Sequence, residues 1–244
     1  IDALSQTLSA NRDLLGTYLI LIEKLRNKEN IRVIISAREF DLNYDPYLIP
    51  LKDNTSFDAG KLENEDVINI LKNLKVIDYS EKLIKFLQTP LHLELFCKVY
   101  SNKKKFIKFF SLNDLYNELW NIKIAKLKPK ETKSSKINTL YSIAAKIYEH
   151  QDLSVNANLF EIEDIEYLQT EGLIFINESN RLVFFHQTFY DYVFAKQFVA
   201  NNKDIIEYLI ENNQGLFIRS SLKIILVHLR EQSPTIYKEL IIKL

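Results

Sequence analysis

The sequence contains no methionine, one cysteine and four glycines among 244 residues. A single cysteine excludes an intrachain disulfide framework and a zinc site built from several thiolates. Four glycines leave no match to the phosphate-binding patterns G-x-x-x-x-G-K-S/T and G-x-G-x-x-G. Because position 1 is Ile1 rather than methionine, we expect the chain to be cut or processed from a longer protein.

Neither the net charge nor the hydropathy indicates a nucleic-acid or membrane partner. Basic and acidic residues number 32 each, so the chain has no overall field that would attract phosphates or anionic lipids. The longest apolar runs fall short of the ~18 residues that a membrane span needs, and no signal peptide is visible. With a single cysteine, these features predict a cytoplasmic protein.

The N-terminal segment has an α/β pattern. Residues 1–4 resemble the end of a strand, residues 11–27 have helical spacing of apolar side chains, and the β-branched run 31–36 is typical of a buried parallel strand. A right-handed crossover would bring the ends of both strands to one sheet edge, where open α/β sheets bind ligands. Asp2 ends the first strand, and Ser36 and Arg38 follow the second.

Asp2 and Arg38 have two interpretations. The carboxylate of Asp2 could hold Mg²⁺ through a water, and the guanidinium of Arg38 could contact a terminal phosphate, because it matches phosphate oxygens bidentately. The simpler alternative is that the two side chains pair with each other at the strand ends, as acids and bases there often do.

The rest of the sequence predicts mainly helices. After a loop at 42–62, apolar side chains recur at helical spacing up to residue 127, with a break at Pro90. The stretch 126–136 holds five lysines, Pro129 and two serines, so we expect a solvated loop and a domain boundary there. Residues 201–244 are again helical and could begin a helical repeat region, although they show no fixed period.

Residues 152–200 predict a winged-helix layout. A short helix at 160–170 stops at Gly172, and two apolar runs flank the turn 177–180 as in a β-hairpin. His186 follows the hairpin and precedes an aromatic-rich helix. From Leu159 to Ile176 there are five acids and no lysine or arginine, which argues against DNA binding because counterion release requires basic side chains.

Four motifs follow one another in the chain. They are Ile1-Asp2-Ala3-Leu4, Ser36-Ala37-Arg38-Glu39-Phe40-Asp41, Thr89-Pro90-Leu91-His92-Leu93 and the run from Phe184 to Ala195 that contains His186. In this order they resemble the STAND class of P-loop NTPases, and the NACHT branch, with its bacterial anti-phage sensors, is the closer match. The resemblance covers nearly the whole chain.

The resemblance implies a role for each candidate residue. Asp2 corresponds to the Walker B aspartate, the catalytic acid that holds Mg²⁺ through a water, and the segment of Ser36 and Arg38 to the sensor of the γ-phosphate. Pro90 corresponds to the lid proline near the adenine, and His186 to the histidine that touches the β-phosphate in the ADP state. ADP would then hold the winged helix closed, and ATP would release it.

The chain departs from this family in two places. The positions after the Walker B aspartate, where the family often has further acids, hold Ser5 and Gln6, which implies slow ATP hydrolysis or a purely binding switch. No Walker A loop is present in these 244 residues, so we expect the loop upstream of Ile1. The chain by itself is therefore not expected to be an active ATPase.

We expect a mainly α fold with a partial α/β start. The resemblance divides it into the C-terminal part of a nucleotide-binding P-loop core (1–55), a helical lid (56–130), a winged-helix domain (131–200) and the start of a helical repeat or sensor region (201–244). The implied ligands are ATP or ADP with Mg²⁺. The implied partners are further copies of the chain on activation and an unidentified protein or phage-derived trigger. The alternatives are a winged-helix DNA-binding regulator and a helical scaffold with a degenerate nucleotide site.

Overall fold

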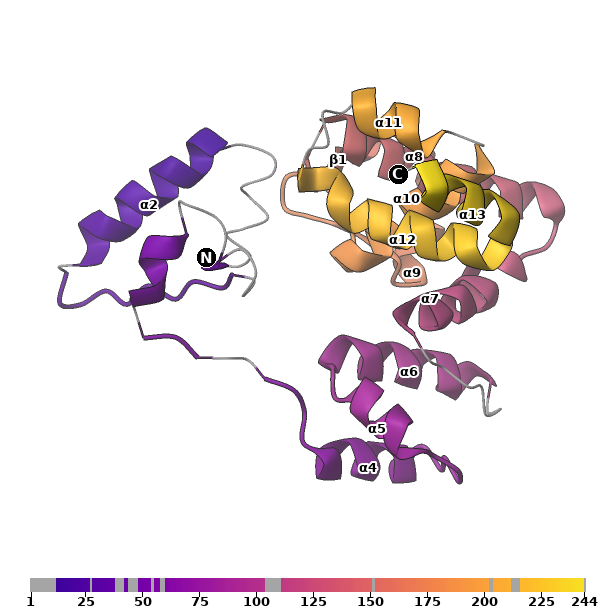
Figure 1. The fold of residues 1–244 in the computed structure, drawn as a ribbon, viewed down its shortest axis with the longest axis horizontal. Helices are drawn as coiled ribbons and strands as arrows, with labels where there is room; N and C mark the ends of the chain where they lie inside the picture. Colours follow the sequence, from indigo (N-terminus) through magenta and orange to yellow (C-terminus); the bar gives the residue numbers. More distant parts are fainter. Residues whose placement is uncertain are drawn as a thin grey trace. The chain divides into compact units, whose positions relative to one another are not determined.

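The computed structural model describes most of the chain as two compact units, one of residues 1–59 with 151–153 and one of residues 60–150 with 154–244. The described residues are 12–26, 28–37, 42–43, 48–53, 55–57, 60–103, 111–150, 152–201, 204–211 and 216–243. They are mainly helical, with one small antiparallel sheet (Figure 1). None of the helices in these ranges is both long and apolar enough to cross a membrane.

The first unit has a small core around the fully buried Leu48. Its other members come from helix α2 (Arg12–Arg26), from the 3-10 helix η1 (Ile49–Asp53) and from the chain between them. They are Tyr18, Leu19, Ile22, Ile35, Leu42 and Leu51. The predicted helix at 11–27 is therefore confirmed, because the apolar stripe of α2 covers this cluster.

The parallel strand predicted at 31–36 is not formed, since residues 31–37 lie in neither a helix nor a strand. The solvent exposure of the side chains still alternates, since Val33 and Ile35 are half-buried and Ile34 is 82% exposed. A β-branched run becomes a strand only where a neighbour supplies the hydrogen-bond ladder. The neighbour predicted at 1–4 lies outside the described residues, as does the segment 38–41 that follows Ala37.

The second unit begins with four helices that pack in chain order: α4 (Asn64–Asn73), α5 (Glu81–Leu87), α6 (Pro90–Lys103) and α7 (Leu112–Trp120). Nearby side chains cap two of these helices. At the start of α5, the Ser80 hydroxyl accepts the Leu83 N–H. Ser111 and Asp114 likewise form a capping box that satisfies two amides at the start of α7. The helix predictions for this part of the chain are confirmed.

A three-stranded sheet follows α7 after the π-helical turn η2 (Asn121–Ala125) and helix α8 (Lys130–His150). Its strands are β1 (Val155–Asn156), β2 (Ile174–Ile176) and β3 (Arg181–Phe184), and β3 lies in the middle, antiparallel to both neighbours. The 3-10 helix η3 (Ala157–Leu159) and helix α9 (Ile162–Thr170) lie between β1 and β2 in the chain. The predicted hairpin is confirmed.

Gly172 ends α9 as the sequence predicts. Its φ of 67° lies in the left-handed region that glycine adopts without strain. The Gly172 N–H donates to the Gln169 carbonyl and the Leu173 N–H donates to the Leu168 carbonyl, both at 2.9 Å. These two hydrogen bonds form a Schellman motif, and they direct the chain from α9 into β2.

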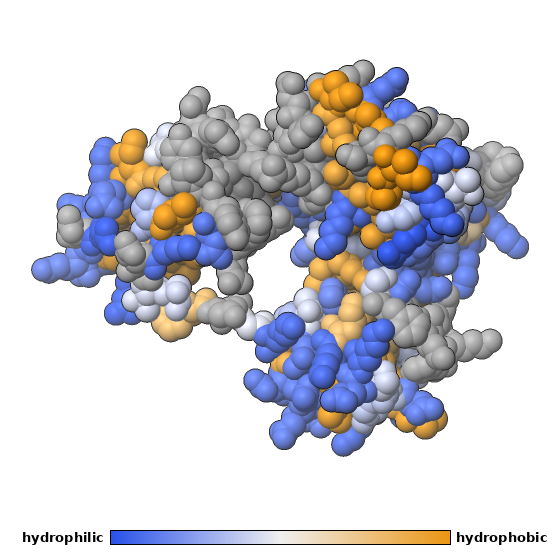
Figure 2. Space-filling view, viewed as in Figure 1, coloured by the Kyte–Doolittle hydropathy of each residue, from blue (hydrophilic) through white to orange (hydrophobic). Residues whose placement is uncertain are grey.

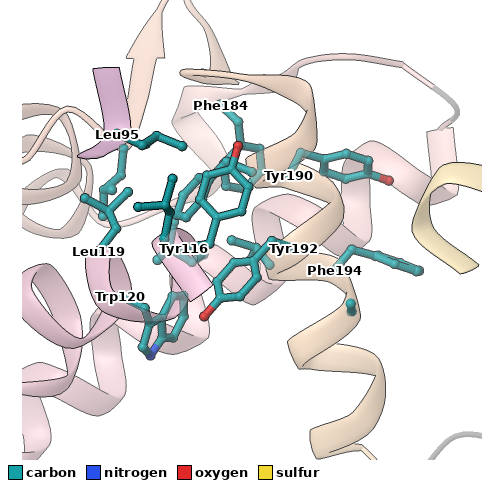
Figure 3. Close-up of a cluster of buried hydrophobic side chains, with 14 of the residues drawn as sticks. Leu95, Tyr116, Leu119, Trp120, Phe184, Tyr190, Tyr192 and Phe194 are labelled. Carbon is teal, nitrogen blue, oxygen red and sulfur yellow. The ribbon is translucent and has the colours of Figure 1, made fainter. Parts of the chain in front are cut away.

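Four helices complete the unit: α10 (Gln187–Ala200), α11 (Ile205–Glu211), α12 (Leu216–Gln232) and α13 (Pro234–Lys243). Helix α10 packs against α7, α8, α12 and β3 (Figure 1). The aromatic core lies between α7 and α10, where the rings of Tyr116 and Tyr192 pack beside each other at a tilt of 40° (Figure 3). Apolar side chains are exposed over α11 and α13 (Figure 2), and they include Ile210, Ile236 and Ile242.

A buried ion pair joins α8 to α9. The Lys136 ammonium donates to the Asp164 carboxylate at 2.5 Å, and both side chains are at most 6% exposed. The hydroxyls of Ser135 and Thr139 donate to the other carboxylate oxygen. Burial by itself would raise the pKa of Asp164, but these hydrogen bonds outweigh burial and hold that pKa below its ordinary value.

The prediction of a solvated loop at 126–136 is therefore wrong in its second half. Helix α8 begins at Lys130, and Lys136 is buried rather than solvated. The physical reason lies 28 residues away, because Asp164 compensates the buried charge. A run rich in lysine and serine indicates a solvated loop only when no distant acid is available to pair with it.

We expect Asp164→Ala to lower the free energy of unfolding by about 3–5 kcal/mol, because it leaves the buried Lys136 ammonium without its partner. The measurement is urea denaturation followed by circular dichroism. Glu163→Ala removes a neighbouring acid with a 90% exposed side chain and should barely change the midpoint. The double variant Lys136→Met with Asp164→Leu should recover most of the loss, whereas a fully additive loss would contradict a paired role.

Candidate functional site

The structure describes three of the five predicted site residues. Asp2 and Arg38 lie outside the described residues. Ser36 belongs to the first unit and is exposed. Pro90 and His186 belong to the second unit, where Pro90 is the exposed first residue of α6 and His186 caps the start of α10. His186 belongs to a hydrogen-bond network with Thr188 and Tyr116.

Pro90 starts α6 because proline tolerates the first helical position, where its missing N–H would have no partner within the helix. Nearby, the Nδ1 of His92 lies 2.8 Å from the Phe86 carbonyl, and the two rings stack. These contacts tie α6 to α5. Helix α6 approaches the neighbourhood of His186 farther along, where the Lys98 ammonium lies 5.3 Å from the centre of the Phe185 ring.

His186 caps α10 with its ring. The N–H of Thr188 donates to the Nδ1 of His186 at 3.1 Å, and the backbone of His186 is extended, as in an N-cap residue. A nitrogen that accepts a hydrogen bond carries no proton. In the neutral imidazole the proton must therefore be on Nε2, which makes Nε2 the hydrogen-bond donor of the ring.

Two hydroxyls extend this network to α7. The Thr188 Oγ1 lies 2.8 Å from Nδ1 of His186 and 2.6 Å from the Tyr116 hydroxyl. Burial raises the pKa of Tyr116, and the Thr188 contact offsets this rise only in part, so the phenol keeps its proton. The Thr188 N–H thus determines the tautomer of the His186 ring, and the Thr188 hydroxyl links the ring to Tyr116 of α7.

Tyr116 and Thr188 were not predicted as site residues. The signal for Thr188 is its position, since the residue two places after an N-cap presents its amide to the cap side chain. Tyr116 is 72 residues from Thr188 in the sequence, and its apolar ring belongs to the core. No local pattern distinguishes its hydroxyl from that of any other core tyrosine.

A second polar cluster lies where α10 meets α12. Lys196 of α10 places its ammonium 5.1 Å from the centre of the Trp120 ring and 5.5 Å from that of Tyr192. The Tyr192 ring also meets His228 of α12 edge-on. Burial lowers the pKa of Lys196. Burial and the charge of Lys196 lower the pKa of His228 to about 4, so His228 is neutral near pH 7.

Hydrogen bonds to α7 complete this cluster. The Asn113 side chain donates to Glu231 of α12 at 2.8 Å, and the Tyr192 hydroxyl donates to Asn117 at 2.9 Å. The Nδ1 of His228 has no hydrogen-bond partner among the described residues. Among those same residues, no group of three or more histidines, cysteines or acids is placed to hold a metal ion.

We expect the His186 cap to stabilise the second unit by about 1 kcal/mol, the usual worth of an N-cap side chain. His186→Ala should lose this contribution in urea denaturation. His186→Asn should retain it, because asparagine is among the best N-cap residues. Equal losses in the two variants would contradict the capping role.

We expect acid to destabilise the chain partly through His228. The pKa of His228 is about 4 in the folded protein, compared with an ordinary value of 6.5. The unfolded chain therefore binds the proton more readily. Its contribution to stability is complete above about pH 6.5 and falls as the pH drops towards 4. In His228→Leu the melting temperature should depend less on pH over this interval. In His150→Gln, at the exposed end of α8, it should depend on pH as in the wild type. An unchanged slope in His228→Leu would contradict the assignment.

Comparison with known proteins adds no assignment: no protein-family model matches this sequence, and no curated protein matches it.

Proposed function

We propose that this chain is the sensing part of an ATP/ADP-dependent regulatory switch of the STAND class, NACHT branch. In this proposal His186 donates its Nε2–H to a phosphate oxygen of the bound nucleotide. The observation that carries the proposal is the hydrogen bond from the Thr188 N–H to Nδ1 of His186, because it leaves the proton on Nε2. A neutral histidine with a fixed Nε2–H is suited to donate to an anion.

The arrangement around the sheet supports a winged-helix domain. Helix α8 precedes β1, helix α9 precedes the β2–β3 hairpin, and the strand order is β1-β3-β2. A short sheet with a hairpin that follows a helix is compatible with the winged helix that the sequence predicts. His186 comes directly after this hairpin, so a movement of the domain would move the histidine with it.

Helix α10 would couple the nucleotide to the C-terminal helices. His186 caps its start, and Lys196 and Tyr192 on the same helix contact α7 and α12. Release of a phosphate from His186 would therefore bias an element that packs directly on α12. The resemblance also gives Asp2 and Arg38 roles at Mg²⁺ and the nucleotide, together with a phosphate-binding loop that these 244 residues do not contain.

DNA is disfavoured as the partner of this winged helix. Helix α9, which would be the DNA-recognition helix, has Glu163 and Asp164 in its first turn and no basic residue in its last turn. Glu161, Glu163 and Glu166 are exposed. These carboxylates would repel phosphates, so we expect no shift of a DNA duplex by the chain in a gel at low salt.

The proposal predicts that His186→Asn releases ADP faster without unfolding the protein. Asparagine keeps the N-cap but is too short to place a donor where Nε2–H lies. The measurement is the dissociation rate of fluorescent mant-ADP from a form of the protein that includes a Walker A loop. We expect an increase of about tenfold or more, the worth of one hydrogen bond to a charged group.

His150→Asn is the matched control, since His150 is an exposed histidine at the end of α8. It should leave the mant-ADP dissociation rate unchanged. Equal dissociation rates in the wild type and in His186→Asn, with both proteins folded, would overturn the role of His186.

A further inference from the structure

A groove of about 430 Å³ lies in the second unit beside Phe185, and nothing in the proposed switch uses it. It runs between α6, the junction of α7 with the π-helical turn η2, and the Schellman turn that joins α9 to β2. Its volume is within the range of small-molecule sites. A π-helical turn such as η2 is rare and often marks a functional site.

The floor and walls of this groove differ in chemistry. Leu119, Leu173 and Phe185 line its apolar side, and because both leucines are at most 3% exposed, the half-buried Phe185 presents most of this surface. Lys98 and Lys123 supply two ammonium groups at the wall. A ligand that contacts both the apolar floor and an ammonium group has a flat apolar body and one anionic group.

The two lysines are not equally accessible to an anion. Lys123 pairs with Glu171 at 2.5 Å, its side chain is only 23% exposed, and its carbonyl accepts the Tyr167 hydroxyl. Lys98 pairs with Glu94 at 2.7 Å on the surface, where the two side chains are 45% and 57% exposed. A surface pair of this kind contributes little to stability. The Lys98 ammonium, which also lies 5.3 Å from the centre of the Phe185 ring, can therefore exchange Glu94 for an anion beside that ring at low cost.

We propose that this groove binds a small aromatic carboxylate, with the ring against Phe185 and the carboxylate on the Lys98 ammonium. Such a ligand would bridge α6 and α7 to the turn between α9 and β2. It would also cover Phe185, the residue next to His186. The groove is therefore a second ligand site, separate from the proposed phosphate contact and independent of any nucleotide.

The single cysteine of the chain reports occupancy of this groove. Cys97 lines it, and no other thiol exists in the sequence. Burial raises the pKa of Cys97, so the thiol is protonated and reacts slowly, on a timescale that is convenient to follow. Alkylation of the 244-residue chain by N-ethylmaleimide, followed by mass spectrometry, therefore measures access to the groove directly.

The probe is 2-naphthoate, without nucleotide, and the neutral comparison is 2-naphthalenemethanol. We expect 2-naphthoate to slow the alkylation of Cys97 with a half-effect near ~1 mM, the affinity usual for a ligand of this size. The alcohol should need about tenfold more, because it lacks the charged hydrogen bond to Lys98. No protection by 2-naphthoate at tenfold above that concentration, or equal protection by both compounds, would overturn the proposal.

Two variants locate the carboxylate. Lys98→Gln should weaken protection by 2-naphthoate about tenfold and leave the alcohol unaffected. Lys85→Gln is its matched control, because Lys85 pairs with Glu81 at the same spacing on α5, with its side chain 69% exposed. Both lysines are at the surface, so both variants should fold, which the melting temperature checks. Equal effects of the two variants would overturn the assignment of Lys98.

Discussion

The burial of helix α10 is the constraint on which the second unit depends. Its buried residues point in every direction around the helix; they are Phe189, Tyr190, Asp191, Tyr192, Val193, Phe194, Ala195 and Phe198. A helix that is apolar all round must be covered on all sides. The elements α7, α8, α12 and β3 provide this cover, so the positions of the surrounding helices follow from the need to bury one of them.

The same constraint determines what lies at the ends of α10. Because the helix is held on all sides, its N-cap residue, His186, has a fixed place, and its ring is oriented by Thr188, whose hydroxyl contacts Tyr116. The few polar side chains inside the cover are then costly and need partners. Lys136 finds Asp164 between α8 and α9, and Lys196 finds the rings of Trp120 and Tyr192. The first contact ties α8 to α9, and the second ties α10 to α7.

Patterns with a local cause could be predicted from the sequence. Helical periodicity located most helices, and the need for a left-handed residue identified Gly172 as the end of α9. Features with a distant cause could not. The burial of Lys136 depends on Asp164, and the network at His186 depends on Tyr116. His228 had a usable signal, because it lies three residues after Ile225 on the buried side of α12, but a lone histidine carries no motif. The run 31–36 shows the opposite error, since β-branched residues alone do not make a strand.

The central claim is that the fold holds the His186 ring with Nδ1 as acceptor and Nε2 as donor. Proton–nitrogen correlation NMR of the histidine ring nitrogens measures this tautomer directly in the 244-residue chain, with His186→Asn used to assign the signals. The account predicts the Nε2–H tautomer for His186 at neutral pH. A neutral ring with its proton on Nδ1 would contradict the account, because Nδ1 could then not accept the Thr188 N–H and the ring would have no Nε2–H to offer a phosphate.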